Sequence, residues 1–355
     1  MKTDSPASII QEILTTSPPA FTNSEAAGIA ADIYGIHASA RLLVSERDQN
    51  FKLDTGDGQS FTLKISNHAE KLDVIDFQNQ ALIHVATRAA SLPLPRVMPA
   101  LDGQLHSSVE RAGKTHFVRL LSWLDGTVIH DSVVDAELAG RMGQLLARLD
   151  GALSGFDHPG SGLPLLWDMK RAAGLADLVI HIKEPDLRKV VDKTLDTFIT
   201  RVKPVLGTLR TQVIHNDMNP GNVLMDRKHT DKIAGLIDFG DMTRSPLIID
   251  LAVAAAYQLH AGDDPLAGAL PMIAGYHSVE PLSETEMELL TDLVRTRLIT
   301  SLLIGSYRSI LFPENREYLM ISYRAARGAL ENLENLQSDE AFSRICRACA
   351  DRPAS

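Results

Sequence analysis

Cysteine is scarce in this sequence. Only Cys346 and Cys349 occur among 355 residues, and two cysteines cannot build the disulfide framework of a small secreted domain. Their C-x-x-C spacing is that of redox and zinc sites, but no second cysteine pair occurs and no βαβ pattern precedes them. We therefore interpret them as two buried thiols in a helical tail and expect neither metal nor redox chemistry there.

Positive charge is also in deficit. Lys and Arg number 35 against 45 Asp and Glu, so the net charge is −10 and the isoelectric point is about 5.6. The field of such a chain repels polyanions and attracts cations. We therefore expect no nucleic acid partner, and we expect ligands among cationic small molecules.

Long apolar runs are missing as well. The stretch "LIIDLAVAAAY" is interrupted by Asp250 and is too short to cross a bilayer. The first residues, "MKTDSPASIIQEIL", lack the positive start and continuous apolar segment of a signal sequence. We expect a cytoplasmic protein with no membrane partner, while nothing in the sequence indicates its oligomeric state.

Strand and turn patterns dominate the first part of the chain. A capping box at Thr22–Glu25 predicts a helix that extends to Tyr34. Apolar and β-branched runs over 41–65 are broken by the polar loop Ser45–Asn50 and by the turn Gly56–Gly58. This pattern predicts three antiparallel strands.

Helical periodicity dominates the rest. Apolar spacing over 72–85 predicts a helix, the segment "THFVRLLSWLDG" predicts a further strand before Gly126, and helices prevail from Ala136 onward. We predict an α+β fold of two lobes, with a small antiparallel β lobe that contains one main helix and a larger, mostly helical lobe. The predicted divisions are an N-terminal lobe at 1–121, a connection at 122–126 and a C-terminal lobe at 127–355.

Polar residues cluster between two short apolar runs in "VIHNDMNPGNVLM". His215 is followed by Asp217 and Asn222, and the next apolar run ends in Asp238-Phe239-Gly240. Phosphoryl transfer requires one carboxylate aimed at an attacking hydroxyl, and a carboxamide and a second carboxylate that bind Mg²⁺ at the nucleotide phosphates. Upstream, Lys64 ends a predicted strand in "FTLKI", where protein kinases carry a phosphate-binding lysine. Alternatively, Asp217 and Asn222 are ordinary turn residues.

Together these motifs resemble the aminoglycoside phosphotransferase and choline kinase superfamily, which has the protein-kinase-like fold. The segments "LKISN", "QVIHNDMNPGNVL" and "GLIDFGDMTRSPLIIDLAVAAAY" are most similar to its hydroxylysine kinase-like branch. The resemblance implies transfer of the γ-phosphoryl group of ATP or GTP to the hydroxyl of a small amino-alcohol, most closely 5-hydroxylysine. Homoserine-type and aminoglycoside-type phosphotransferases remain alternatives, as does a non-catalytic nucleotide-binding module.

The resemblance also implies roles for single residues. The N-terminal lobe would bind the nucleotide, and the helical lobe would hold the catalytic loop and the acceptor pocket. The implied roles are Asp217 as catalytic base, Asn222 and Asp238 as Mg²⁺ ligands, Lys64 at the α- and β-phosphates, the backbone of Ser122 to Leu124 at the purine, His215 as a packing residue, and Asp250 as a brace for the catalytic loop.

Two departures from the superfamily concern the nucleotide. The loop Ser45–Asn50 has no glycine, so side chains and amides of that loop would have to grip the phosphates. Gln78 occupies the position where the superfamily usually has a glutamate partner for the strand lysine, with Asp76 nearby. The partner of Lys64 is therefore left open.

The residues that would bind the acceptor molecule are expected in the helical lobe. Asp241 would meet an ammonium group or be a solvated or capping acid, and Arg297 would clamp a substrate carboxylate or form an internal salt bridge. Trp167 and Asp168 would line the pocket or form a core tryptophan with a nearby cap, and we expect Tyr257 in the core. The segment 241–249 is too short for a phosphorylatable activation loop, which favours a small-molecule acceptor over a protein.

Overall fold

The structure is a computed structural model that describes residues 16, 18–45, 47–129, 134–229, 231–259, 264–313 and 316–351, without the side chains of Tyr318 and Leu319. The expectation about the first residues of the chain lies outside these ranges. So does Glu46 of the predicted phosphate loop.

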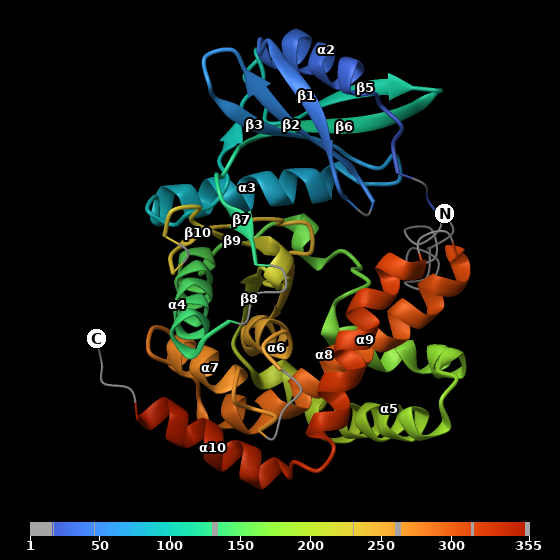
Figure 1. Ribbon diagram of the computed structural model, residues 1–355, viewed down its shortest axis with the longest axis vertical. Coiled ribbons are helices and arrows are strands. Elements are labelled where there is room, and N and C mark those ends of the chain that lie inside the picture. The colour runs from blue at the N-terminus through green and yellow to red at the C-terminus, as the bar shows by residue number, and fades with distance from the viewer. Residues whose placement is uncertain are drawn as a thin grey trace.

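An antiparallel sheet forms the N-terminal region (Figure 1). Over the described residues it has six strands in the order β1-β2-β3-β6-β4, and β5 also pairs with β6. The strands are β1 (Ala38–Leu43), β2 (Gln49–Thr55), β3 (Ser60–Ile65), β4 (Val97–Met98), β5 (Ser107–Arg111) and β6 (Lys114–Ser122). β2 and β3 meet at the Gly56–Gly58 turn, so the three antiparallel strands predicted over 41–65 are confirmed.

Helix α2 (Asn23–Tyr34) covers one face of this sheet. Its first turn has the predicted capping box, in which Thr22 and Glu25 satisfy each other's backbone N–H groups. Side chains along a strand alternate between the two faces, so alternate residues of β2, β3 and β6 face the helix. The resulting core contains Ala26, Ala30, Phe51, Leu53, Leu63, Ile65, Val118 and Leu120.

Helix α3 (Leu72–Arg88) lies between the sheet and the helical region (Figure 1). Phe77 and Leu82 on its apolar face belong to the large core of the helical region. Gly160, in the short helix η1 (Pro159–Gly162), approaches α3 so closely that a Cβ there would lie 2.4 Å from the Asp73 carbonyl oxygen. The main helix of the sheet region is therefore packed directly onto the helical region.

The rest of the chain is mostly helical, as predicted. Its longer helices are α4 (Ala136–Leu153), η2 (Met169–His181), α5 (Pro185–Thr197), α6 (Ile248–Ala256), α7 (Ala269–His277), α8 (Glu284–Leu311), α9 (Arg316–Leu333) and α10 (Ser338–Ala350). A search of the described residues finds no helix with the length and apolar character needed to span a membrane.

Short strands carry the polar motifs into this helical region. β9 (Val223–Met225) pairs with β10 (Ile233–Leu236) and with β7 (Thr127–Val128), while β8 (Thr211–Ile214) pairs with β11 (Thr243–Pro246). β7 and β11 were not predicted, because two to four residues hold no periodic pattern.

Two glycines let the chain after β6 lie against the β9–β10 hairpin. A Cβ on Gly126 would lie 2.9 Å from the Met225 carbonyl oxygen, and a Cβ on Gly235 would lie 2.6 Å from Leu124 Cδ1. The absence of side chains at these positions brings the segment that follows the sheet next to the two strands that lie between Asn222 and Asp238.

Candidate active site

The loop that carries His215 and Asp217 runs from β8 to β9 and is held by helix α6. Both carboxylate oxygens of Asp250 accept backbone N–H bonds, from His215 at 2.8 Å and from Asn216 at 2.7 Å. Asn216 has a φ of +65°, in the left-handed region that Asn tolerates better than most residues. The fully buried Asp250 thus makes the contacts that its predicted bracing role requires.

His215 is also fully buried. Its Nδ1 accepts a hydrogen bond from the Asp217 amide at 3.2 Å, so we assign the proton of the neutral ring to Nε2. The ring meets Phe239 edge-on, with 4.8 Å between ring centroids, and burial lowers the pKa of His215. These contacts suit the predicted packing role, since a neutral buried ring is a poor proton carrier.

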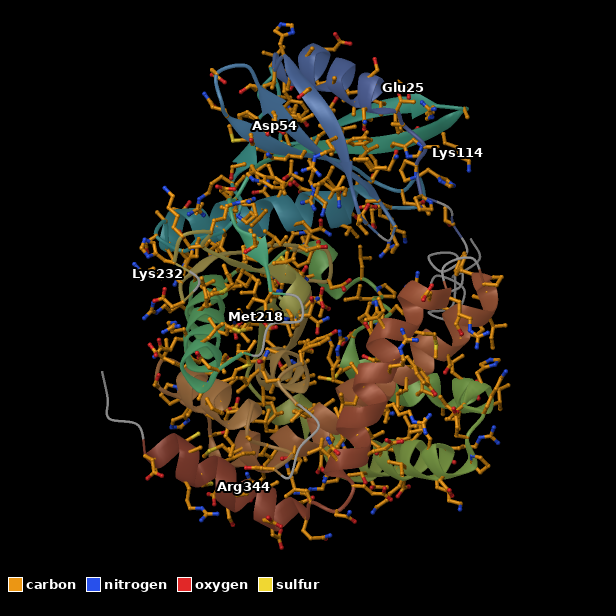
Figure 2. The ribbon with its side chains drawn as sticks, viewed as in Figure 1. Glu25, Asp54, Lys114, Met218, Lys232 and Arg344 are labelled. Atoms are coloured by element: carbon orange, nitrogen blue, oxygen red, sulfur yellow. The ribbon has the colours of Figure 1, made fainter. Side chains whose placement is uncertain are left out.

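The Asp217 carboxylate is held by two asparagine side chains. Asn219 Nδ2 donates to Oδ1 at 3.0 Å, and Asn222 Nδ2 donates to Oδ2 at 2.7 Å and to the Asp217 backbone oxygen at 2.9 Å. The neighbouring Met218 is fully buried and lies well inside the outline of the molecule (Figure 2). Asp217 is therefore fixed on a rigid, buried loop, as a group that positions a hydroxyl must be.

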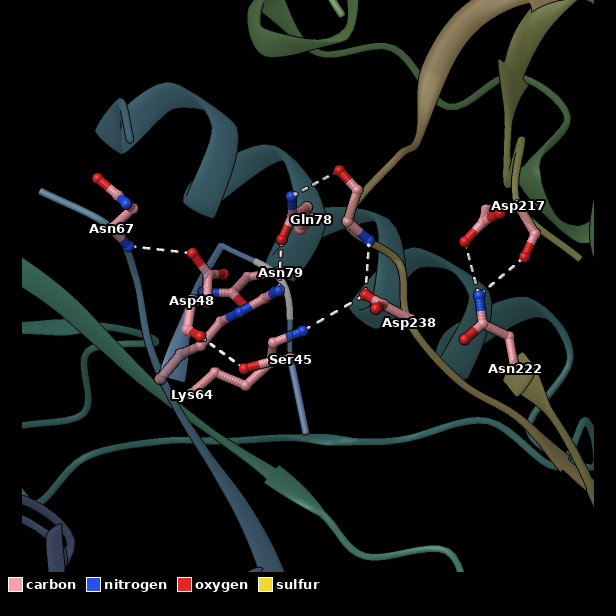
Figure 3. Close-up of polar contacts among 11 residues, drawn as sticks. Ser45, Asp48, Lys64, Asn67, Gln78, Asn79, Asp217, Asn222 and Asp238 are labelled. Atoms are coloured by element: carbon pink, nitrogen blue, oxygen red, sulfur yellow. Dashed lines mark hydrogen bonds and ion pairs between the residues drawn. The ribbon is translucent and has the colours of Figure 1, made fainter. Parts of the chain in front are cut away.

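Lys64 and Asp238 face each other across the two regions (Figure 3). Lys64 Nζ, on β3, lies 3.4 Å from Asp238 Oδ1, and the same oxygen accepts from the Gly240 amide at 3.2 Å. The Lys64 ammonium lowers the pKa of Asp238. Asp238 is thus the partner of Lys64 that the sequence left open, and it is an anion.

The oxygen atoms at this point fit a magnesium ion. Asn222 uses its amide nitrogen to hold Asp217, which leaves its carbonyl oxygen for a cation, and Asp238 contributes an anionic oxygen. Mg²⁺ prefers such hard oxygens and is commonly bound by one or two protein groups together with phosphates. Within the described ranges, no group of three or more His, Cys, Asp or Glu side chains is placed to hold a metal alone. Asn222 and Asp238 therefore suit a metal that arrives with a nucleotide.

In the described structure, Gln78 and Asp76 form their hydrogen bonds with residues other than Lys64. Gln78 Nε2 donates to the Gly240 carbonyl oxygen at 3.3 Å, and Gln78 Oε1 accepts a short hydrogen bond from Arg119. Asp76 instead lies 3.1 Å from His158 Nε2. Gln78 therefore connects helix α3 to the loop that carries Asp238.

Arg119 is a site residue that the sequence reasoning missed. It lies opposite Lys64 in the β3–β6 register, is 3% exposed and donates to Asn79 Oδ1 at 3.2 Å as well as to Gln78. An arginine inside the apolar strand "FVRLLS" was the available signal, because a buried guanidinium requires several acceptors.

In the predicted phosphate loop, the side chains of Ser45 and Asp48 are already engaged in hydrogen bonds. Ser45 Oγ donates to the Asp48 carbonyl oxygen at 2.5 Å, and Asp48 Oδ1 accepts from the Asn67 amide at 3.0 Å. Asn50 pairs with Lys64 in the β2–β3 register, and its Oδ1 is buried without a hydrogen-bond partner in the described structure. Asn50 therefore lies on the strand pair that carries Lys64, the predicted phosphate-binding lysine.

The predicted purine segment has fewer free backbone N–H groups than expected. The Ser122 amide donates to the Arg96 carbonyl oxygen at 2.8 Å, and the Trp123 amide donates to the Ser60 carbonyl oxygen at 3.3 Å. Ser122 Oγ is also occupied, since it accepts from the Arg96 amide at 2.9 Å. Among the described residues, the Leu124 amide forms no such backbone hydrogen bond, so it is the backbone N–H of this segment that remains available.

Arg297 lies directly beside Asp217. Its guanidinium is 3.7 Å from Asp217 Oδ1, donates to the Tyr257 hydroxyl at 3.0 Å, and lies over the Trp167 ring at 4.9 Å from the ring centroid. The residue is 3% exposed, and its Nε and Nη1 have no hydrogen-bond partner in the described part of the chain. A cavity of about 60 Å³ adjoins it. Arg297 therefore forms the internal ion pair that one prediction expected. It also has unused donors for a further anion, as the other prediction requires.

Two carboxyl groups, Asp217 and Asp241, share this environment. Burial and the neighbouring Asp241 raise the pKa of Asp217 to about 8, against the opposing effect of Arg297. Burial and Asp238 raise the pKa of Asp241 to about 6. A cationic group placed between the two carboxylates would relieve their repulsion.

Two neighbouring predictions change in detail. Tyr257 packs only partly against the core, because its hydroxyl accepts from Arg297. Asp168 is 4% exposed and accepts a hydrogen bond from the Lys170 amide, so it caps helix η2. Of the two predicted roles, Asp168 therefore has that of a helix cap and not that of a pocket residue.

Other candidate sites lie apart from these residues. Cys346 and Cys349 are half-buried on α10, not buried as expected, because they lie on a surface helix at the far end of the helical region from the sheet (Figure 1). Burial raises the pKa of the Cys349 thiol to about 11. A cavity of about 220 Å³ between α5, α8 and α9 contains none of the predicted site residues. Its buried Asp292 is paired with Arg201 and Arg295, each at 3.4 Å, so we assign no site there.

Comparisons with known proteins show which family the chain resembles. Residues 39–282 match the phosphotransferase enzyme family. Hydroxylysine kinase of Danio rerio is 32% identical over 338 residues, covering 91% of this chain and 94% of that protein. Homoserine kinase of Rhizobium etli is 29% identical over 275 residues, covering 75% of this chain and 79% of that protein.

A solved structure supports the fold. A microcompartment-associated aminopropanol kinase superposes with a TM-score of 0.65 at 19% identity, covering 89% of this chain and 98% of that one. The predicted two-lobe kinase-like fold and the resemblance to the hydroxylysine kinase-like branch are both confirmed by these similarities. The chain therefore belongs to the phosphotransferase enzyme family and is a kinase that acts on an alcohol group.

Proposed function

We propose that this protein transfers the γ-phosphoryl group of ATP or GTP to the hydroxyl group of 5-hydroxylysine. The similarity to hydroxylysine kinase over more than nine-tenths of both chains supports this acceptor. The observation that carries the proposal is Arg297, a buried cation beside Asp217 with two guanidinium nitrogens, Nε and Nη1, that lack a hydrogen-bond partner in the described structure. Such a group selects an acceptor that brings its own carboxylate.

The acceptor would lie across Asp217, Asp241 and Arg297. Its carboxylate would accept hydrogen bonds from Arg297 Nε and Nη1, while the Trp167 ring covers the guanidinium face. In 5-hydroxylysine the side-chain ammonium lies on the carbon next to the hydroxyl carbon. That ammonium would lie near Asp241 and so place the hydroxyl beside Asp217.

Asp217 would act on the hydroxyl proton. The hydroxyl oxygen attacks the γ-phosphorus as its proton passes to Asp217, and the bond from the γ-phosphorus to the bridging oxygen of the nucleoside diphosphate breaks. Asn219 and Asn222 keep the carboxylate oriented, and Lys64 contributes positive charge to the phosphates. Asn222 and Asp238 would hold Mg²⁺, which neutralises phosphate charge when bound. The free Leu124 amide would bind the purine, and it can serve adenine or guanine.

Homoserine is the second candidate, because the homoserine kinase similarity covers 75% of this chain. It also has a carboxylate, an ammonium and a hydroxyl, but it lacks an ammonium on the carbon next to the hydroxyl carbon. Either molecule would therefore offer a carboxylate to Arg297. Asp241 would favour hydroxylysine, because only hydroxylysine has an ammonium group next to the hydroxyl carbon.

A nucleotide-consumption assay over four acceptors, each with ATP and with GTP, tests the acceptor. The panel contains 5-hydroxylysine, homoserine, 1-amino-2-propanol, which has no carboxylate, and kanamycin, which has several amines and no carboxylate. We expect hydroxylysine to have the highest kcat/KM. A preference for homoserine would select the second candidate, and a preference for kanamycin would overturn the carboxylate requirement.

Arg297→Ala tests the clamp. Because the lost hydrogen bonds to a carboxylate are charge-assisted, the KM for hydroxylysine should rise by about 10- to 100-fold, with little change in the KM for nucleotide. The KM for 1-amino-2-propanol should not rise, since it offers no carboxylate. Arg324→Ala, which removes an exposed arginine from α9, is the matched control. An equal loss for both acceptors would show that Arg297 supports Asp217 and does not bind substrate.

A further inference from the structure

Gln78, on α3, uses both ends of its side-chain amide. The residue is 5% exposed, and its Oε1 accepts a short hydrogen bond from Arg119. Its Nε2 donates to the Gly240 carbonyl oxygen at 3.3 Å, and the Gly240 amide donates to Asp238 Oδ1 at 3.2 Å (Figure 3). Gln78 therefore joins a buried cation of the sheet to the loop that carries the proposed magnesium ligand.

Arg119 determines which way the Gln78 amide points. A guanidinium group has only donors, so the atom of Gln78 that faces Arg119 must be the oxygen. The amide nitrogen is then left to face Gly240, whose carbonyl oxygen requires a donor. Asn79 is oriented in the same way, since its Oδ1 accepts from Arg119 at 3.2 Å and its Nδ2 donates to the Leu105 carbonyl oxygen at 3.0 Å. A replacement for Gln78 must therefore supply both an acceptor and a donor.

The loop that Gln78 holds has a backbone conformation that needs support. Asp238 has a φ of +62°, in the left-handed region that is unfavourable for a residue with a side chain. From the helical region, Asn216 Nδ2 donates to the Asp241 carbonyl oxygen at 3.1 Å. Gln78 supplies the corresponding contact from α3, so the loop is held from both regions.

We propose that Gln78 is a positioning residue for Mg²⁺ binding. By its hydrogen bond to Gly240, it couples the place of α3 to the conformation in which Asp238 presents its carboxylate to the metal. The inference rests on the proposed role of Asp238 as a Mg²⁺ ligand. An ionised glutamate at this position would accept from Arg119 equally well but would have no hydrogen to donate to Gly240. The amide of glutamine is therefore what the coupling requires.

Gln78→Glu tests this role, because it keeps the size and the acceptor for Arg119 and removes the donor to Gly240. The Mg²⁺ concentration that half-saturates nucleotide binding should rise by about 5- to 10-fold, since the loop loses a hydrogen bond that holds its metal-binding conformation. Titration calorimetry with non-hydrolysable analogues of ATP and GTP, over a series of Mg²⁺ concentrations, measures this rise. Gln78→Met, which is neutral and of similar length, should have the same effect and decides the matter if the charged variant does not fold.

Asn79→Asp is the matched control. It makes the same change from amide to carboxylate beside the same arginine, but the donor that it removes serves Leu105, in the segment before β5. Its Mg²⁺ requirement should stay within about twofold of wild type, even if its melting temperature falls as far as that of Gln78→Glu. An equal rise in both variants would show that Gln78 only stabilises the fold. No rise in Gln78→Glu would also overturn the proposal.

The calorimetric measurement needs no acceptor, so a failure of 5-hydroxylysine as substrate would leave its result standing. Asp238→Asn, titrated in the same way, tests the metal assignment separately. Unchanged Mg²⁺ dependence in Asp238→Asn would overturn that assignment and this inference with it. A weakened dependence in Asp238→Asn without any rise in Gln78→Glu would overturn the role of Gln78 alone.

Discussion

At the scale of single residues, Asp217 and Asp238 are both acids of the proposed phosphoryl-transfer site, yet their surroundings shift their pKa values in opposite directions. Burial and Asp241 raise the pKa of Asp217 to about 8, whereas Lys64 lowers the pKa of Asp238. A raised pKa suits a group that accepts a proton during the reaction, and a lowered pKa suits a permanent anion that binds a cation. The neighbouring residues therefore suit Asp217 to accept a proton and Asp238 to bind a cation.

Replacing these two acids by Asn should give different defects. Asp217→Asn should lower kcat by about 100-fold or more and leave nucleotide binding nearly intact, because the group that positions the hydroxyl is lost. Asp238→Asn is the counterpart and should weaken magnesium-dependent nucleotide binding, since a hard cation loses an anionic ligand. Titration calorimetry with nucleotide, with and without Mg²⁺, measures the second effect. Wild-type turnover in Asp217→Asn would remove that residue from the mechanism.

At the scale of elements, the close contact between α4 and α7 depends on glycine. A Cβ on Gly143 would lie 2.1 Å from the Met272 carbonyl oxygen, and a Cβ on Gly275 would lie 2.1 Å from the Gly140 carbonyl oxygen. The helix backbones therefore approach more closely than any side chain would permit. The same approach brings Tyr276 to Asp150.

Gly143→Ala should destabilise the protein by about 1–3 kcal/mol, because the methyl group meets backbone atoms that cannot move aside without separating the helices. Gly151→Ala, in the same helix, is the control, since no atom lies within 4 Å of a Cβ there. It should be neutral or stabilise by up to about 1 kcal/mol, as Ala is the better helix former. Urea unfolding of the two variants measures the difference. Equal stabilities would contradict the packing argument.

At the scale of the whole molecule, the buried acids determine how stability depends on pH. The folded structure raises the pKa of Asp150, Asp217, Asp241, Asp250 and Asp292. A carboxyl group with a raised folded pKa favours the folded state fully below its unfolded pKa, and this contribution is lost as pH rises through the folded pKa. Acids with lowered pKa, such as Asp238, act in the opposite sense and only at lower pH.

The melting temperature should therefore fall between pH 5 and pH 8. The unfolded acids are ionised across this window, while Asp241 and Asp217 release their protons near pH 6 and pH 8. Differential scanning calorimetry in buffers of constant ionic strength measures the slope. Asp217→Asn should have a shallower slope, because one of the titrating groups is removed. A melting temperature that rises over this range would contradict the proposed balance of charges.

Much of the fold and part of the site followed from local sequence. The capping box at Thr22, the turn at Gly56–Gly58 and the ordered motifs with Asp217, Asn222 and Asp238 all have their chemistry within a few consecutive residues. Helix, turn and strand signals are short-range, since they reflect backbone preferences and spacing. The sequence by itself therefore determined the two-lobe α+β architecture and the residues from which a phosphoryl-transfer site could be built.

The pairing of charges was decided only by the tertiary structure. Lys64 pairs with Asp238 and not with α3, Arg119 takes Gln78, and Arg297 lies beside Asp217. A buried charge selects its partner by proximity after packing, and these partners are separated by 41 residues for Arg119 and Gln78 and by 174 for Lys64 and Asp238. From local sequence alone, a charged residue could be a helix cap, a member of an ion pair or part of a ligand site. Which of these roles it has is decided only when β3, β6, α3 and α8 pack close to the loop that carries Asp217.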